Sequence, residues 1–322
     1  MNTALSELIN AYLANYDVLK SYSKMESGST SYAAASNLLC AHHMIADTAG
    51  LLQCRKLLRA NEKLFSSFRA YTELFSVCVL YISGDPEAKL LRAKQNYTEL
   101  RKHFSDSSML SVVAFLLDEI AKPEQIPAIA ERAKLLYKKM RKIHPFLTGS
   151  EDILFTAVLA LSSKSDDDLI DETESIYKLV TPLTESNARQ TISHILSMTD
   201  EPVEAKCEKL SVLCTGLKNA GIKYRNDLSF AILAMLSLLN DSPEEIVSDI
   251  AEVSAAIAEN KKYQGIFGID TKTRLTHTAM ILSTHYASSN SVSGYLGIVI
   301  AVMAAVEAAE AAATSAAIIS TT

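Results

Sequence analysis

The hydrophobic positions of the chain form short apolar stretches, and each is followed by a longer segment in which apolar residues recur with helical spacing. Four of the boundaries between them carry a proline, namely Pro86, Pro123, Pro202 and Pro243. Proline is favourable at the first position of a helix, because the N–H that it lacks would have no partner there. The pattern therefore predicts pairs of helices, the first short and apolar and the second long and amphipathic.

Two independent sets of markers give the same period. The proline boundaries recur about every 40 residues, if the acidic turn at 165–168 takes the place of a missing proline. The long segments align separately on five positions, which are Tyr97, Tyr137, Tyr177, Cys214 and Ser254. One hairpin cannot bury its apolar faces alone, whereas stacked hairpins bury them continuously. We therefore predict an all-α solenoid of antiparallel helix hairpins with a repeat of about 40 residues.

The array is expected to fill the whole chain, 1–322, as a single domain. Residues 1–30 are predicted to form an N-terminal cap helix and a loop, 31–287 the hairpin repeats, and 288–322 an Ala-rich C-terminal helix. The first repeat is degenerate, with its helices expected at 31–46 and 51–65. We therefore expect about fourteen or fifteen helices and no sheet. The low content of Gly (ten) and Pro (seven) is consistent with a chain that has few β-turns.

The Ala-rich C-terminal segment differs in composition from the rest. Its uncharged part, 292–306, is shorter than the roughly 20 residues needed to span a bilayer, and Glu307 and Glu310 then interrupt it. We expect a small-residue helix that packs against the end of the solenoid or against a second copy of the chain. A peripheral membrane role is the weaker alternative.

Charge and cysteine content narrow the class of protein. A net charge of −6 disfavours a nucleic-acid binder, and the basic run at 138–142 is interpreted as a solvated helix end. The five cysteines show no C-x-x-C spacing, as is usual for free thiols in a reducing compartment. The N-terminus has no basic and apolar leader, so we expect a cytoplasmic protein.

Catalytic and cofactor signatures are not found. The chain lacks the motifs of serine hydrolases, zinc proteases, P-loop nucleotide-binding proteins and dinucleotide-binding proteins. His43 and Asp47 are spaced to share one helix face, but no third ligand is suggested nearby, so no metal and no cofactor are expected. Whether the protein is an enzyme stays open, with the balance toward a non-catalytic one.

The loops that lead from each long helix to the next short one should lie along one edge of a hairpin solenoid. These loops hold polar residues that would suit a ligand groove, with Arg for an anion, amides for orientation and His for proton transfer. The candidates are Arg69, His144, Asp152, Asn187, Gln190, His194 and Arg274. The competing interpretation is scaffolding between repeats: Thr148 and Glu151 fit a capping box, and His194 lies among apolar neighbours.

Several of these segments resemble a bacterial family of unknown function, DUF4003. The resemblance is carried by the sequences at 144–152, 186–194 and 268–274 and by the closing Ala-rich helix. It runs from about residue 60 to the end. It implies no activity, substrate or catalytic residue, and it favours treating the chain as one unit.

Three functions remain as hypotheses. The first is a non-catalytic interaction protein that binds a peptide or a protein partner, because hairpin arrays present extended surfaces. The second is a small-ligand binder or enzyme that uses the polar edge, with His144 or His194 as acid–base and Arg69 or Arg274 as anion clamp. The third is self-assembly into a homo-oligomer, or peripheral membrane binding, through the C-terminal helix.

Overall fold

The protein is all-helical in the computed structural model, which describes residues 2–23, 28–64, 66–69, 72–184, 186–222, 224, 227–239, 241–266 and 268–287. This part of the chain contains fourteen α-helices and two short 3₁₀ helices, η1 (Pro123–Gln125) and η2 (Lys261–Tyr263), and no strand. The all-α prediction is confirmed. The Ala-rich segment 288–322 lies outside the described residues, so the expectations for it stay predictions.

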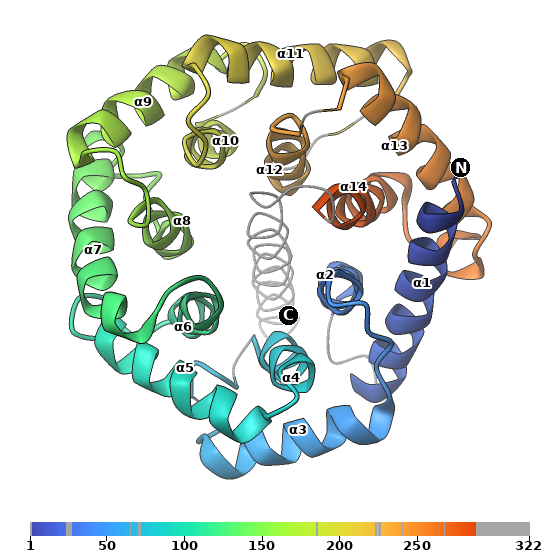
Figure 1. Ribbon diagram of the computed structural model, residues 1–322. Helices are drawn as coiled ribbons and strands as arrows, with labels where there is room; N and C mark the ends of the chain where they lie inside the picture. Colours follow the sequence, from blue (N-terminus) through green and yellow to red (C-terminus); the bar gives the residue numbers. More distant parts are fainter. Residues whose placement is uncertain are drawn as a thin grey trace, which may run out of the picture.

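The helices form two concentric layers (Figure 1). The odd-numbered helices make the outer layer: α1 (Thr3–Ser23), α3 (Thr48–Asn61), α5 (Pro86–Leu100), α7 (Ile126–Ile143), α9 (Asp166–Leu179), α11 (Val203–Asn219) and α13 (Pro243–Ala258). The even-numbered helices make the inner layer: α2 (Ser29–Ala41), α4 (Glu73–Ile82), α6 (Ser108–Ile120), α8 (Asp152–Leu159), α10 (Ser186–Leu196), α12 (Asp227–Leu236) and α14 (Thr271–Ala287).

The array of hairpins closes on itself. Each inner helix packs against the next, and the last of them, α14, packs against α2 and α1 at the start of the chain. The Thr284 hydroxyl donates a 2.7 Å hydrogen bond to the Asn37 side chain across this junction. We call the junction of α1 and α2 with the segment from η2 to α14 the seam. The curvature that makes a ring was not predicted from the sequence.

Burial explains why one set of helices is inside. In α6, Val112–Leu117 are all buried, so the helix has no solvent face and must be covered on every side. In α7 the buried positions recur at three- and four-residue intervals and most of the others are charged, as in a helix with one exposed face. The short apolar and long amphipathic segments of the sequence thus correspond to the inner and outer layers.

Proline starts two of the four outer helices for which the sequence predicted it. Pro86 and Pro243 occupy the first turns of α5 and α13, and Ser242 forms a capping box with Glu245. Two prolines differ from the prediction: Pro123 starts the 3₁₀ helix η1, and Pro202 is the residue that precedes α11.

The N-terminal region departs further from expectation. The segment predicted to be a cap contains α1, which occupies an outer position like the other long helices and completes the ring (Figure 1). The helices expected at 31–46 and 51–65 are α2 and α3, both of which end earlier. His43, with φ of 54°, interrupts the first of them, and the Asp47 side chain caps the second.

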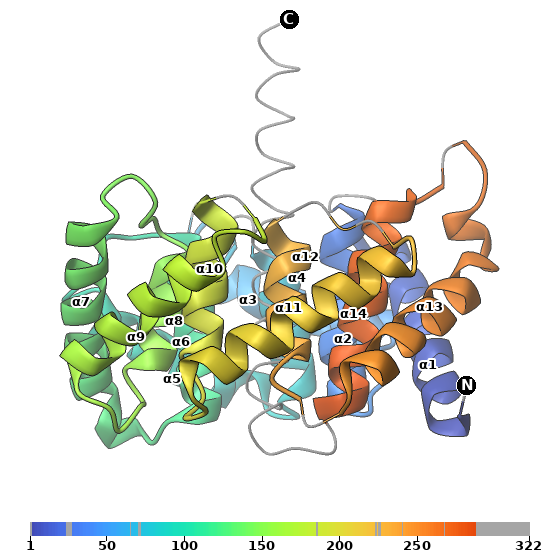
Figure 2. The same ribbon diagram turned by 90° about the horizontal axis from the view of Figure 1, so that it is seen from above.

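The two edges of the ring differ in the connections that they carry. The described segments that lead from an outer to an inner helix lie at one edge, uppermost in Figure 2, which we call the rim edge. The sequence predicted that the loops leading from each long helix to the next short helix lie along one edge. No described helix has both the length and the apolar character to cross a membrane.

Candidate binding site at the ring seam

Three of the predicted site residues meet at the rim edge between α8 and α10. Gln190 Nε2 donates to Asp152 Oδ1 at 3.1 Å, and His194 Nδ1 lies 3.3 Å from the same oxygen. The other carboxylate oxygen of Asp152 accepts from the Gly149 N–H at 2.7 Å. Exposed fractions of 4 %, 4 % and 2 % for Asp152, Gln190 and His194 leave little of them open to a ligand. The visible role of this cluster is to fix the 148–152 loop to α10.

Within the described residues, the other four predicted side chains make no hydrogen bond to that cluster or to one another. Arg69 donates to the Glu62 carbonyl at 3.0 Å, His144 Nε2 lies 2.8 Å from Glu174, and Arg274 Nε lies 3.3 Å from the Ser254 hydroxyl. Asn187 is exposed. The structure therefore does not gather all seven side chains into one groove, and ligand binding by any of them stays a prediction.

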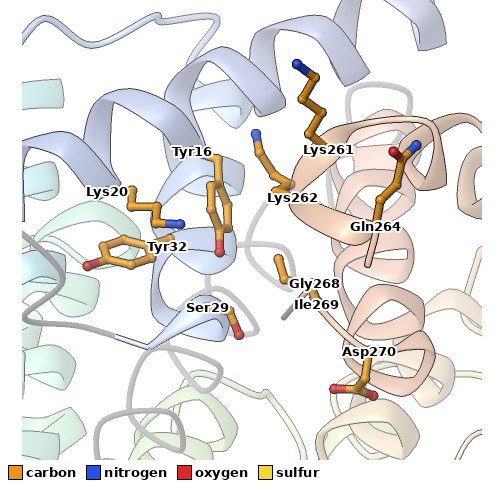
Figure 3. Close-up of a pocket in the computed structure, with 10 residues that line it drawn as sticks. All are labelled: Tyr16, Lys20, Ser29, Tyr32, Lys261, Lys262, Gln264, Gly268, Ile269 and Asp270. Atoms are coloured by element: carbon orange, nitrogen blue, oxygen red, sulfur yellow. The ribbon is translucent and has the colours of Figure 1, made fainter. Parts of the chain in front are cut away.

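A pocket of about 630 Å³ opens at the rim edge in the seam (Figure 3). Its walls come from the two ends of the described chain: α1 and the start of α2 on one side, and the segment between α13 and α14 on the other. The residues that line it are Tyr16, Lys20, Ser29, Tyr32, Lys261, Lys262, Gln264, Gly268, Ile269 and Asp270. The last three belong to a loop that the sequence placed at this edge.

Lys262 is the most enclosed of the three lysines in the pocket wall. Its side chain is 9 % exposed, its ammonium lies 3.0 Å from the Asp17 carboxylate, and it donates to the Leu13 carbonyl at 3.3 Å. It also lies 4.8 Å from the centre of the Tyr16 ring. Burial lowers the pKa of Lys262, while the hydrogen bond to Asp17 opposes that shift. These contacts hold a positive charge between the first and last hairpins.

Lys20 and Lys261 are exposed, and no ion pair or hydrogen bond to another residue of the described ranges holds either ammonium. The opposite edge of the ring is different. There Lys89 pairs with Asp118 at 2.7 Å, Arg132 with Asp166 at 2.8 Å, and Lys206 donates to the Thr199 carbonyl at 3.0 Å. These three cations of the opposite edge are thus engaged in fastening helix ends, whereas Lys20 and Lys261 at the seam are available to a ligand.

The start of α2 adds backbone donors to the pocket. Gly28 precedes this helix, and no side chain of the residues that the structure describes caps it. The first helical hydrogen bond runs from the Tyr32 N–H to the Gly28 carbonyl at 3.2 Å, so the N–H groups of the residues between have no partner within the helix. Because a helix N-terminus carries a partial positive charge, it adds to the field of the lysines.

The facing wall is a loop shaped by two glycines. Gly265 has φ of 77°, a left-handed conformation that strains other residues. A Cβ on Gly268 would lie 2.4 Å from the Gln264 carbonyl oxygen, so a side chain there would push the backbone apart. The Ile269 N–H donates to the Lys262 carbonyl at 2.9 Å and closes the loop. The glycines therefore let the lysines and Asp270 approach one pocket.

Asp270 contributes the carboxylate of the lining. Its side chain caps α14, accepting from the Lys272 N–H at 2.9 Å and from the Thr273 hydroxyl at 2.6 Å. The hydrogen bond from the Thr273 side chain, followed by backbone N–H groups, lowers the pKa of Asp270. Figure 3 shows Asp270 at one end of the view, away from the ammonium groups of Lys20, Lys261 and Lys262.

Aromatic side chains form the floor beneath these polar groups. The Tyr16 and Tyr32 rings meet edge to face with centroids 5.6 Å apart. Behind them, the Tyr263 hydroxyl lies 2.9 Å from His277 Nδ1, and burial lowers the pKa of His277 to about 3. The imidazole is therefore neutral at pH 7, and this floor is a fixed, uncharged surface.

The chemistry that this lining can perform is recognition of an anion. Lysine ammonium groups and helix N–H groups donate to carboxylate or phosphate oxygens. Among the described residues no group of three His, Cys, Asp or Glu is placed to hold a metal ion. Burial also raises the pKa of Cys40 and Cys207 to about 11, which keeps these thiols protonated.

The fold and the pocket define the chain as an all-α ring protein with a cationic pocket at its seam. A family model, described as a protein of unknown function (DUF4003), matches residues 15–311, and the chain belongs to this family. The match begins well before residue 60, where the resemblance was expected to start, and so it includes Tyr16 and Lys20. Neither the curated proteins nor the solved structures gave a significant match.

Sequence reasoning missed most of the pocket. Tyr16, Lys20 and Tyr32 lay in a segment interpreted as a cap and a degenerate repeat, and Lys261 and Lys262 lay beyond a helix with no evident partner. The one available signal was the Gly268–Asp270 part of the rim loop at 268–274. The pairing of these two regions depends on ring closure, which the spacing of apolar residues does not encode.

Proposed function

We propose that this protein is a binding protein whose ligand is a small anionic molecule held in the seam pocket. The observation that carries the proposal is that Lys20, Lys261 and Lys262 all line one cavity at the junction of the first and last hairpins. Like charges repel, so such a grouping is costly unless an anion offsets it, and Asp17 pairs with only one of the three.

The size and lining of the pocket support a small molecule. Its volume of about 630 Å³ lies within the range of roughly 300–1,000 Å³ that is typical of ligand sites. Tyr16, Tyr32 and Ile269 supply apolar surface for the body of a ligand, and the lysines supply the groups that orient its charge. A few polar groups on an apolar floor are the usual composition of such a site.

Native mass spectrometry of the full chain, purified from its own cytoplasm at low salt, tests the proposal. We expect an added small mass that is lost from the Lys20→Ala/Lys261→Ala double variant and kept by Lys138→Ala/Lys142→Ala, a control that removes two exposed lysines from α7. A wild-type protein that carries no anion, and to which none of a panel of carboxylates and phosphates binds, would contradict the proposal.

A second candidate function is binding of a protein partner to the rim edge, as a non-catalytic interaction protein. The observation that favours it is the exposure of Phe146 in the α7–α8 loop and Ile266 in the α13–α14 loop, each 97 % exposed. Single exposed apolar residues are common, but two fully exposed on one edge suit a flat protein surface. Capture of a defined partner that is lost in Phe146→Ser/Ile266→Ser, with Lys20→Ala unaffected, would favour this function.

Two further observations support the cellular location and the repeat architecture that we propose for this protein. Free cysteines, four of the five buried, support the cytoplasmic location. Outer helices that begin at residues 86, 126, 166, 203 and 243 support a helical-repeat architecture, in which the seam is the one junction between unlike ends of the array.

A further inference from the structure

The charges in the seam pocket are arranged asymmetrically, and this arrangement limits the ligand more than its net charge does. The three ammonium groups lie apart from the Asp270 carboxylate, and Ser29, at the start of α2, lies between them in the view of Figure 3. A ligand anionic at both ends would place a negative group against Asp270. The pocket therefore favours a molecule with an anion at one end and hydrogen-bond donors at the other.

We infer that the ligand is a phosphate ester of a small hydroxylated or amino compound, with the phosphate toward Lys20, Lys262 and the start of α2, and the donors toward Asp270. This inference rests on the proposed function, namely anion binding in the seam pocket. It adds the chemical class of the ligand and the direction in which the ligand lies.

The cationic end suits phosphate better than a single carboxylate. A phosphate monoester carries nearly two negative charges at neutral pH and three terminal oxygens, which several donors can share. The available donors are separate ammonium groups and the first N–H groups of α2, a thirteen-residue helix for which the described residues provide no side-chain cap. Helix N-termini and lysines acting as point charges are both common phosphate ligands.

The opposite end requires an organic group with donors. The cavity of about 630 Å³ is far larger than a phosphate group alone. Asp270 remains exposed, and its lowered pKa keeps the carboxylate ionised at neutral pH. Hydroxyl or ammonium groups on the ligand would donate to the Asp270 oxygens in addition to the N–H and hydroxyl groups at the start of α14 that this carboxylate already accepts from.

Isothermal titration of the full chain with glucose 6-phosphate, phosphoethanolamine, inorganic phosphate, gluconate and glucose tests the inference. We expect at least one of the two esters to bind more tightly than inorganic phosphate or gluconate, and glucose not to bind. The Lys20→Ala variant should weaken binding of that ester about tenfold, equivalent to about 1.4 kcal/mol. Lys142→Ala, which removes an exposed lysine from the last turn of another outer helix, should not change it.

The Asp270→Asn variant tests the direction of the ligand. Asparagine keeps an oxygen that can cap α14 but removes the negative charge. We expect it to leave the affinity for inorganic phosphate unchanged or higher, and to remove most of the advantage of the ester. Equal losses for the ester and inorganic phosphate, or no loss for the ester, would overturn the predicted direction.

The remaining outcomes separate the inference from the proposed function. Lys20-dependent binding of gluconate, with no binding of either ester, would overturn the phosphate inference and leave the anion pocket standing. If no anion binds, or if Lys142→Ala weakens binding as much as Lys20→Ala does, both fail, because the interaction is then absent or a general effect of surface charge.

Discussion

The seam pocket and the cluster of Asp152, Gln190 and His194 lie on the same edge of the ring. They differ in whether their polar groups contact one another or surround an open cavity. In the cluster, Gln190 hydrogen-bonds to Asp152 of the neighbouring hairpin, His194 lies 3.3 Å from the same carboxylate, and all three side chains are almost completely buried. In the pocket, groups from the two ends of the chain surround a cavity, and two of three lysines have no partner among the described residues. Polar groups that satisfy one another stabilise a fold, whereas groups left open around a cavity are available to a ligand.

The largest effect should come from removing the centre of the cluster. Asp152→Ala removes the acceptor of the part-buried Gly149 N–H and one of the two acceptors of the buried Gln190 amide, which keeps Thr148, so we expect the free energy of unfolding to fall by about 3 kcal/mol. Urea denaturation measures this loss, with Asp171→Ala, an exposed position, as control. Affinity for an anion at the seam should be unchanged in the folded fraction. An Asp152→Ala protein of normal stability would mean that the cluster is not structural.

Low pH should decrease the free energy of unfolding, because His277 beneath the seam pocket is held neutral in the fold. Its pKa is lowered to about 3 in the fold because burial disfavours the charged form. The unfolded chain binds the proton first as pH falls below about 6.5, so stability is lost from there down toward pH 3. We expect about 2 kcal/mol of this loss between pH 6.5 and pH 5.

The variant His277→Gln isolates this contribution because glutamine does not titrate in that range. Denaturation at several pH values should show a shallower dependence than in the wild type, even if the variant is less stable at pH 7. An unchanged slope would show that His277 is not held neutral in the fold.

A smaller effect on stability, but a clear one on binding, is expected from Gly268→Ala. The added Cβ meets the Gln264 carbonyl, so the 264–270 loop must shift and move one wall of the pocket. We expect a loss of about 1 kcal/mol in stability and about tenfold in the affinity for the tighter-binding ester. Gly216→Ala in α11, where the nearest atoms to the added Cβ belong to the Val247 side chain, is the control away from the pocket. Wild-type affinity in Gly268→Ala would exclude this loop from the site.

The smallest effect should be that of Asn187→Ala. Asn187 is a predicted site residue that the structure leaves exposed at the start of α10. We expect a change of less than about 0.5 kcal/mol in stability and none in anion affinity. A large loss of binding in this variant would move the site from the seam to the α9–α10 loop.

The helices and their layers could be predicted because they depend on local pattern. Apolar runs such as 112–117 are buried on every side and lie inside, while segments with one apolar face, such as α7, lie outside. The common edge of the connecting loops follows from the antiparallel hairpins. Asp152, Gln190 and His194 lie on that edge in neighbouring hairpins. Their proximity could therefore have been predicted from the order of the hairpins.

Ring closure and the pocket could not be predicted, because they depend on the small rotation between successive hairpins. Whether α14 meets α1 and α2 is the sum of these rotations, and a small change in each would leave an open superhelix. Lys262 contacts Asp17, Leu13 and Tyr16 only because the ring closes. Until closure is known, the Lys261–Lys262 pair cannot be distinguished from an ordinary solvated helix end.

Lysine footprinting is the most direct test of the claim that the seam is the binding site. The full chain would be labelled with an amine-acylating reagent, with and without the ester that binds more tightly, and the label on each lysine measured by mass spectrometry. We predict that the ester protects Lys20 and Lys261 and leaves the labelling of Lys142 unchanged. Unchanged labelling of Lys20 and Lys261 under saturating ester, or protection of Lys142 instead, would contradict the account.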